Sequence, residues 1–133
     1  MCKSNWKINN QTLDEVPENA EGFVYRITNV ITGKYYIGRK SFWSRTTKKI
    51  KGRKNRKHFK NESNWRSYCS SSKLLKEDIK TLGIENFKFE ILKICRTKKQ
   101  MSYYENKFQF LFEVLETDTY NENILGKFFR KDI

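Results

Sequence analysis

The sequence is poor in proline, histidine and cysteine, and it contains no long apolar run. It has one proline, one histidine and three widely spaced cysteines, Cys2, Cys69 and Cys95, among 133 residues. An odd number of widely spaced cysteines argues against a disulfide framework and against a zinc site. No segment is long enough to span a bilayer, and none has the pattern of a signal peptide. We therefore expect a cytoplasmic protein in a reducing compartment, without a membrane partner.

Acidic residues are absent between Gly38 and Lys60, although the chain as a whole contains 15 of them. The formal net charge is +13, and this one stretch holds eleven lysines and arginines. A surface that only maintains solubility mixes both signs of charge, whereas binding to phosphates requires one sign. An anionic membrane surface is the weaker alternative to nucleic acid. We predict that the nucleic-acid contacts come from Arg39, Lys40, Lys48, Lys49, Lys51, Arg53, Lys54, Arg56, Lys57 and Lys60.

The hydrophobic pattern predicts a single α+β domain. Alternating residues indicate strands over 23–28 and 34–38, joined by a turn over 29–33, and a third strand over 87–95. Residues 39–67 are expected to start as a short helix or loop and to continue into the basic segment. The predicted order is β-β-α-β-α with a basic insert, in which helices flank a small three-stranded antiparallel sheet. Residues 1–21 form an extension packed on the domain at 22–126, and residues 127–133 form a tail.

Both predicted helices have sequence signals at their ends. Serines 70–72 offer N-caps for a helix over 73–82, and Gly83 suits its C-terminal end. Thr97 and Gln100 have the spacing of a capping box, which begins a second helix that extends to about Glu116. Helical spacing predicts a buried face of Met101, Tyr104, Phe108, Leu111 and Leu115, and a polar face of Asn106, Gln109 and Glu113.

Residues 22–38, GFVYRITNVITGKYYIG, resemble the signature hairpin of the GIY-YIG endonuclease family. GFVY stands in place of the first motif, without its isoleucine, and Tyr36-Ile37-Gly38 is the second motif intact. Ten residues separate Tyr25 from Tyr36, which is the spacing expected of the family. The resemblance covers about residues 22–125 and is strongest to small phage-encoded members, either homing-type or free-standing. A phage-encoded protein would act in the cytoplasm of its host.

The resemblance also implies the remaining catalytic positions. An arginine, a glutamate and an asparagine are expected to follow the hairpin in that order, and Arg45, Glu105 and Asn121 fill these places. Arg39 directly follows the glycine and is the alternative arginine. Glu105 is expected to bind one divalent metal ion, Mg²⁺ or Mn²⁺, because hard cations prefer oxygen ligands.

The implied reaction is metal-dependent hydrolysis of DNA phosphodiester bonds. Tyr25 would activate the attacking water, Tyr36 would orient the phosphate or the water, and Arg45 would hold a phosphate oxygen through its planar fork. A phenol with a pKa near 10 is a poor base, so we expect nearby cations to lower the pKa of Tyr25. Gly38 would allow the backbone to approach the nucleic acid closely.

Other functions remain open at this point. A basic DNA- or RNA-binding module on a degenerate nuclease fold would need no catalytic residues. A restriction-type nuclease could use Glu105-Asn106-Lys107 as its E-x-K motif, but on a helix these two side chains point apart. A ββα-metal nuclease would need several histidines, and the single one, His58, receives no role. We expect no small-molecule cofactor, and a monomer or a transient dimer on DNA. Specificity should be loose unless the basic segment itself reads bases.

Overall fold

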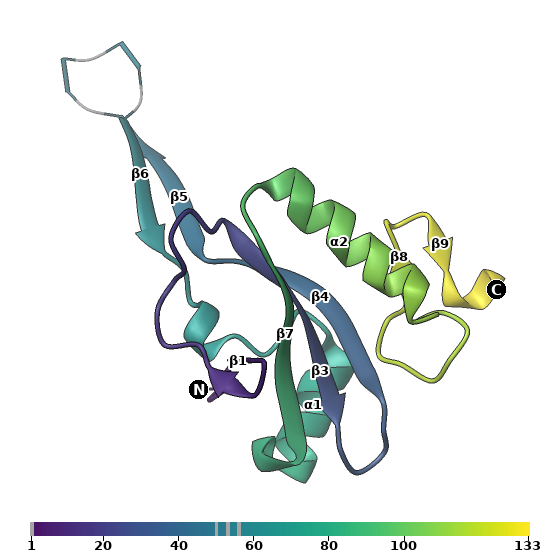
Figure 1. The fold of residues 1–133 in the computed structure, drawn as a ribbon. Helices are drawn as coiled ribbons and strands as arrows, with labels where there is room; N and C mark the ends of the chain where they lie inside the picture. The colour runs from purple at the N-terminus through teal and green to yellow at the C-terminus, as the bar shows by residue number, and fades with distance from the viewer. Residues whose placement is uncertain (1, 50, 53, 56) are drawn as a thin grey trace.

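Three long antiparallel strands form the centre of the computed structural model, which describes residues 2–49, 51–52, 54–55 and 57–133 (Figure 1). The middle strand, β3 (Gly22–Asn29), pairs with β4 (Tyr35–Ser41) on one side and with β7 (Phe87–Cys95) on the other. These strands confirm the hairpin and the third strand predicted from alternation. β4 forms one edge of the sheet, so one side of the YIG motif lacks a neighbouring strand.

The sheet has five strands, and the prediction of a purely antiparallel sheet of three is wrong in this respect. β1 (Lys7–Ile8) runs parallel to β7, and β2 (Gln11–Thr12) pairs antiparallel with β1, which gives the order β2-β1-β7-β3-β4. Strands of two residues are too short for alternation to reveal them.

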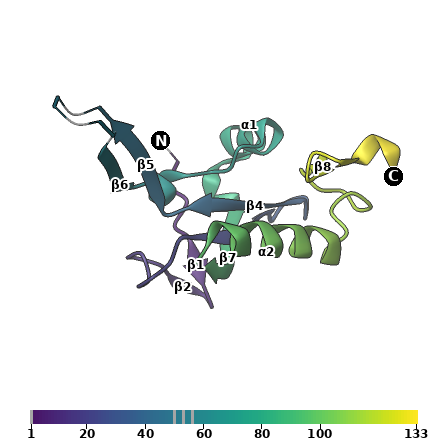
Figure 2. The same cartoon turned by 90° about the horizontal axis from the view of Figure 1, so that it is seen from above.

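The two helices cover opposite faces of the sheet (Figure 2). Helix α1 (Lys73–Leu82) begins where the Ser72 hydroxyl accepts a hydrogen bond from the Leu75 amide, and it ends at Gly83, whose φ is 92°. Helix α2 (Lys98–Leu111) begins where the Thr97 hydroxyl accepts from the Gln100 amide at 3.0 Å. Both helix starts are confirmed. Neither described helix combines the length and apolarity that a membrane crossing requires.

Helix α2 ends at Leu111, which is earlier than predicted, and this changes the residues that its C-terminal half buries. Glu113 adopts a left-handed φ of 51°, and the chain turns away from the helix axis. Leu111 is consequently 64% exposed, whereas Leu115, beyond the helix, is buried. Gln109, predicted on the polar face, is 6% exposed. Periodicity alone could not reveal that this face lies against the backbone of the edge strand β4.

The sheet separates two hydrophobic clusters of different character. The face covered by α1 is largely aromatic, and the face covered by α2 is largely aliphatic. Phe23, Tyr25 and Ile27 of β3 point to the aromatic cluster, whereas Val24 points to the other. This alternation follows from the two-residue period of a strand. Short elements complete the chain: η1 (Trp65–Ser67), η2 (Ile84–Asn86), β8 (Asn123–Ile124), β9 (Phe128–Phe129) and η3 (Arg130–Asp132).

The basic segment forms a two-stranded ribbon, and the prediction that residues 39–67 start as a short helix or loop is wrong, because β4 continues to Ser41 and β5 begins at Trp43. β5 (Trp43–Lys48) and β6 (Lys57–Glu62) pair antiparallel and project away from the sheet (Figure 1). We call the described residues among 43–62 the basic ribbon. The dense cations concealed the strand signal in the sequence, although Thr46 and Thr47 are β-branched residues that favour strands.

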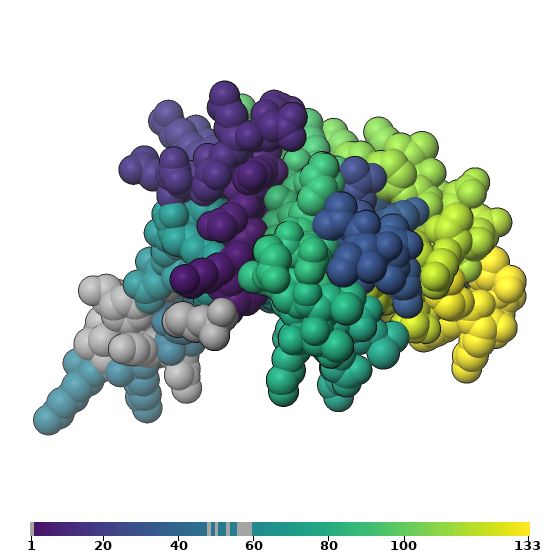
Figure 3. Space-filling view, turned by 90° about the horizontal axis from the view of Figure 1, so that it is seen from below, coloured from purple at the N-terminus to yellow at the C-terminus, as the bar shows by residue number. Residues whose placement is uncertain are grey.

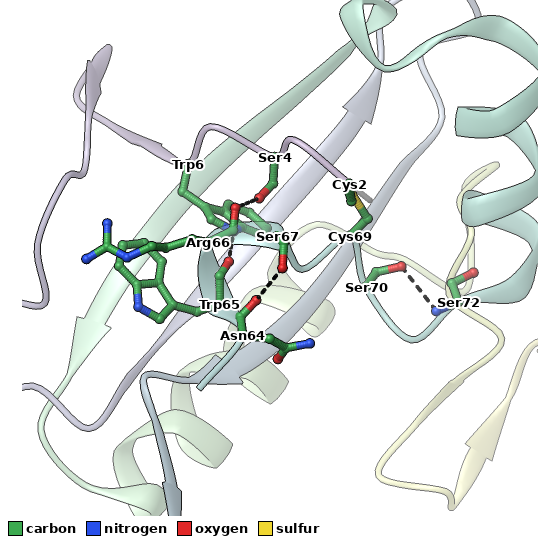
Figure 4. Close-up of a disulfide and its surroundings, with 10 residues drawn as sticks. All are labelled: Cys2, Ser4, Trp6, Asn64, Trp65, Arg66, Ser67, Cys69, Ser70 and Ser72. Carbon is green, nitrogen blue, oxygen red and sulfur yellow. Dashed lines mark hydrogen bonds between the residues drawn. A yellow bond between two sulfur atoms is a disulfide. The ribbon is translucent and has the colours of Figure 1, made fainter. Parts of the chain in front are cut away.

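The N-terminal segment packs against the middle of the chain (Figure 3). Trp6 is buried, and its ring lies 4.9 Å from that of Tyr25. Its indole nitrogen donates to the carbonyl of Trp65 at 2.8 Å. A disulfide joins Cys2 to Cys69, with Cα atoms 6.1 Å apart (Figure 4). The spacing argument against disulfides is therefore wrong for this pair, because folding brings together cysteines 67 residues apart.

Candidate active site

The two motif tyrosines lie side by side on the aromatic face of the sheet. Tyr25 of β3 is directly opposite Gly38 of β4, and the rings of Tyr25 and Tyr36 are 6.2 Å apart. A Cβ at position 38 would lie 2.6 Å from the Tyr25 hydroxyl oxygen and 2.8 Å from the Tyr36 ring. Gly38 is therefore required for space inside the site. This differs from the role expected from the sequence, a close approach to nucleic acid.

Tyr25 is almost completely buried, with 1% of its surface exposed. Burial raises the pKa of Tyr25 well above its ordinary value, and the neighbouring Tyr68, Tyr36 and Glu105 raise it further. The expectation that nearby cations lower this pKa is wrong for the free protein, because the ring lies within the core. Tyr25 therefore carries its proton at neutral pH.

A third tyrosine, Tyr68, belongs to the same cluster and was not identified from the sequence. The Tyr68 ring lies 6.1 Å from the Tyr25 ring. The Lys40 ammonium lies 4.4 Å from the centre of the Tyr68 ring. Burial lowers the pKa of Lys40. The Tyr36 hydroxyl lies 3.3 Å from the Ser71 hydroxyl. No spacing rule links Tyr68 to the hairpin, because the basic ribbon separates the two in sequence.

Glu105 approaches the same region from helix α2. An open pocket at the exposed edge of β4 is lined by Tyr36 and Arg39 from the strand, and by Ser102, Glu105 and Asn106 from the helix. Burial raises the pKa of Glu105, and Arg39 partly offsets this effect. Side chains from the two faces of the sheet share this pocket because no further strand covers the edge of β4.

Arg39, and not Arg45, is the arginine beside Glu105. The Arg39 Nε lies 3.7 Å from a Glu105 carboxylate oxygen, and Arg39 also donates to the Ser102 hydroxyl. Arg45 lies on the basic ribbon, where its two terminal nitrogens donate to both carboxylate oxygens of Glu21 at 2.8 and 2.9 Å. The planar fork expected to hold phosphate is thus already paired within the protein. This bond lowers the pKa of Glu21.

Asn121 holds the backbone of the YIG motif. Its side-chain oxygen accepts from the Ile37 amide at 3.0 Å, and its nitrogen donates to the Ile37 carbonyl at 2.9 Å. Gln109 donates to the same carbonyl at 3.1 Å. Asn121 is 3% exposed, and this pairing uses both ends of its amide. Asn121 therefore lines the pocket and holds the backbone of Ile37 in place.

Arg130 orders the loop that carries Asn121. Its guanidinium donates to the carbonyls of Val114, Thr117 and Asn121, and to the Thr119 hydroxyl. These bonds give hydrogen-bond partners to carbonyl and hydroxyl oxygens of the loop that follows α2. Sequence reasoning did not identify Arg130, because an isolated arginine in a polar tail carries no pattern.

The predicted nucleic-acid contacts lie partly on the basic ribbon and partly on β4. Lys49, Lys51, Lys54 and Lys60 are exposed. Lys60 also lies 4.2 Å from the centre of the Trp43 ring. Lys48 and Lys57 belong to the strands of the ribbon, whereas the predicted contacts Arg53 and Arg56 lie outside the described residues.

The donor set around Glu105 is compatible with one Mg²⁺ ion. No cluster of three or more histidine, cysteine or acidic side chains occurs among the described residues. Mg²⁺ does not need such a cluster, because it keeps several waters and often takes only one or two carboxylates, together with substrate phosphates. The partly buried Glu105 carboxylate, in a pocket that contains further amide oxygens, meets this requirement.

The paired tyrosines, the glycine between them and the glutamate from a later helix agree with the resemblance seen in the sequence, and the chain belongs to the GIY-YIG endonuclease family. Residues 6–133 match the family described as "Putative endonuclease segE, GIY-YIG domain". The chain is also 34% identical over 104 residues to the "Putative endonuclease segD" of Enterobacteria phage T4. That match covers 78% of this chain and 38% of that relative, so the chain spans well under half its length. No solved structure matches this chain significantly.

Replacing Asn121 by aspartate should destabilise the protein in a pH-dependent way. At neutral pH a carboxylate oxygen would face the Ile37 carbonyl in place of an N–H donor, at a cost of about 1–3 kcal/mol. The folded-state pKa of the new carboxyl would be raised above its unfolded value of about 3.9. The destabilisation should therefore be smallest below that unfolded pKa and grow as the pH rises through the folded-state pKa.

Denaturant unfolding of Asn121→Asp at several pH values measures this effect. Asn123→Asp is the control, because the exposed Asn123 only accepts a bond, from the Gly126 amide, and a carboxylate can do the same. Equal stability of the two variants at neutral pH would contradict the assigned role of Asn121.

Proposed function

We propose that this chain is a metal-dependent endonuclease that hydrolyses DNA phosphodiester bonds in the pocket beside β4. One observation supports this most directly: Tyr36 and Glu105, two members of the motif set that lie far apart in sequence, line one open polar pocket. The net charge of +13 attracts a polyanion to the protein, and the pocket is open to it. The alternative, a binding module on a degenerate fold, does not require an acidic side chain in a phosphate-binding pocket.

The tyrosine pair positions the water and the phosphate. Tyr36 is partly exposed, and its hydroxyl lies near that of Ser71, so it can bind a phosphate oxygen or the attacking water directly. Tyr25 lies behind it and is 1% exposed. We propose that its hydroxyl contacts the attacking water in the substrate complex. There it accepts a hydrogen bond from the water and orients it for attack.

Arg39 supplies positive charge to the scissile phosphate. In the free protein it is the counter-ion of Glu105, and 45% of its side chain is exposed. An exposed arginine can exchange a carboxylate for a phosphate oxygen at little cost. We propose Arg39 for the role that the sequence resemblance assigned to Arg45.

Glu105 would hold the divalent ion, with the remaining ligand positions open to water and phosphate oxygens. When bound, the ion supplies charge neutralisation on the phosphate and a more acidic water. The protein's own contribution is the orientation of Glu105, which the close packing of α2 against β4 fixes. Because only the carboxylate binds a hard cation, cleavage should decrease as the pH falls through the raised pKa of Glu105.

Glu105→Gln should abolish cleavage and leave DNA binding intact or slightly tighter. The amide keeps the size of the side chain but loses the negative charge that a hard cation needs. The measurements are nicking of supercoiled plasmid with Mg²⁺ or EDTA, single-turnover cleavage across a Mg²⁺ titration, and a gel shift on the same duplex. Glu116→Gln, an equal charge change on an exposed residue beyond α2, is the control. Cleavage by Glu105→Gln at the parent rate, with the same Mg²⁺ midpoint, would exclude Glu105 as the ligand.

Arg39→Gln and Arg45→Gln distinguish the two candidate arginines. If Arg39 contacts the phosphate in the transition state, its loss should lower single-turnover cleavage by about 100-fold or more. Arg45→Gln removes the bond to Glu21 and should retain most of the cleavage rate. The opposite order of effects would assign the phosphate-binding role to Arg45.

A further inference from the structure

The basic ribbon continues directly from the strand that carries the YIG motif. Phe42 alone separates β4 from β5. Phe42 is fully buried, and its ring lies 5.1 Å from each of the rings of Phe23 and Trp65. A buried aromatic residue packed on two sides cannot act as a hinge. The direction in which the ribbon leaves the domain is therefore fixed relative to the pocket.

Hydrogen bonds hold the base of the ribbon on both strands. The Phe42 amide donates to the Glu21 carbonyl at 2.9 Å, and the Ser63 amide donates to the Phe42 carbonyl at 2.7 Å. The Trp43 indole donates to the Ala20 carbonyl at 2.8 Å. The two-bond contact between Arg45 and Glu21 lies one step further along the ribbon. The segment around Glu21 thus clamps the ribbon to the nuclease domain.

The size and the chemistry of the ribbon suit the major groove of duplex DNA. Its paired strands have six residues each, which corresponds to a length of about 20 Å. A two-stranded ribbon fits the major groove, about 12 Å wide, but is too wide for the minor groove of about 6 Å. The ribbon also carries exposed polar side chains that can bond to base edges. In the described part these are Ser44, Thr46, Thr47 and Asn61.

We propose that the basic ribbon lies in the major groove of duplex DNA, and that its clamped base fixes the distance between this groove contact and the phosphate that is cut. The proposal deepens the proposed nuclease function and rests on it. Cations on the ribbon supply affinity through phosphates, and its polar side chains supply a preference for sequence. Because the connection through Phe42 is rigid, the phosphate that is cut lies at a fixed distance from the groove contact.

A shortened ribbon tests the groove contact. Replacing residues 46–59 by Asn-Gly joins Arg45 to Lys60, which are paired across the ribbon, by a two-residue turn. The clamp remains, and circular dichroism with a thermal melt checks that the shortened variant is folded. Its affinity for duplex DNA should fall, and the slope of log affinity against log salt should decrease by about 0.9 for each phosphate that the variant no longer neutralises. Methyl green, which occupies the major groove, should displace the parent protein, whereas netropsin in the minor groove should not.

Two outcomes of the binding measurements, made without metal, would overturn the groove contact: an unchanged salt slope, or displacement by netropsin alone. A preference of the parent for duplex RNA would do the same, because the major groove of RNA is too narrow to admit the ribbon. A parent protein that binds but never cuts would refute the proposed nuclease function, while the displacement result would still decide the position of the ribbon.

Glu21→Ala tests the clamp, with Glu18→Ala as a control that removes an equal charge from an exposed position in the same segment. We expect Glu21→Ala to bind and cut DNA, but to cut over several neighbouring phosphates of an end-labelled duplex where the parent cuts at one. The Glu18→Ala variant should keep the cutting position of the parent. A single unchanged cutting position in Glu21→Ala, or scattered cutting by both variants, would show that the clamp does not set the distance.

Discussion

The backbone of Ile37 is the point on which the rest of the site depends. β4 is an edge strand, and an unpaired edge exposes amide and carbonyl groups that need partners. Asn121 pairs with both groups of Ile37, and Gln109 adds a second bond to its carbonyl. These bonds connect the YIG strand, the helix that carries Glu105 and the C-terminal loop. The three sequence segments of the site therefore have one fixed arrangement, and the side of β4 beyond these bonds stays open to substrate.

A second constraint acts within the hairpin. Two tyrosines share one face of β3 and β4, and only a residue without a side chain leaves room for the Tyr25 hydroxyl at position 38. This packing buries Tyr25 and keeps its hydroxyl protonated, because burial disfavours the phenolate. The proposed chemistry consequently depends on orientation by Tyr25 and on charge supplied by Arg39 and a bound cation. A tyrosine that acts as a phenolate base would instead need surroundings that lower its pKa.

The sequence predicted the parts of the fold that have strong local signals. The alternating hairpin, the strand over 87–95 and the helix starts at Ser72 and Thr97 follow from periodicity and capping, and the structure contains all of them. The basic ribbon could not be predicted in the same way, because paired strands that project into solvent have no buried face to alternate. The short N-terminal strands and the contact of Cys2 with Cys69 depend on partners distant in sequence.

The site shows the same division. Tyr25, Tyr36 and Glu105 were predicted from motif order, and the structure brings them to one region. The choice between Arg39 and Arg45 could not be made from spacing, because it depends on the path of the chain after β4. Gln109 and Arg130 bond mainly to backbone groups, and backbone partners leave no trace in a sequence.

The central claim, that the Tyr25 hydroxyl takes part in cleavage, is tested most directly by comparing Tyr25→Phe with Tyr35→Phe. Both changes remove one hydroxyl from the same hairpin, but Tyr35 faces α2 and donates to the Phe112 carbonyl at 2.7 Å. Single-turnover cleavage of a DNA duplex should fall by orders of magnitude in Tyr25→Phe, with DNA affinity unchanged. Tyr35→Phe should cut at the parent rate and melt at a lower temperature. Cleavage by Tyr25→Phe at the parent rate would contradict the account and leave Tyr25 as a residue of the core.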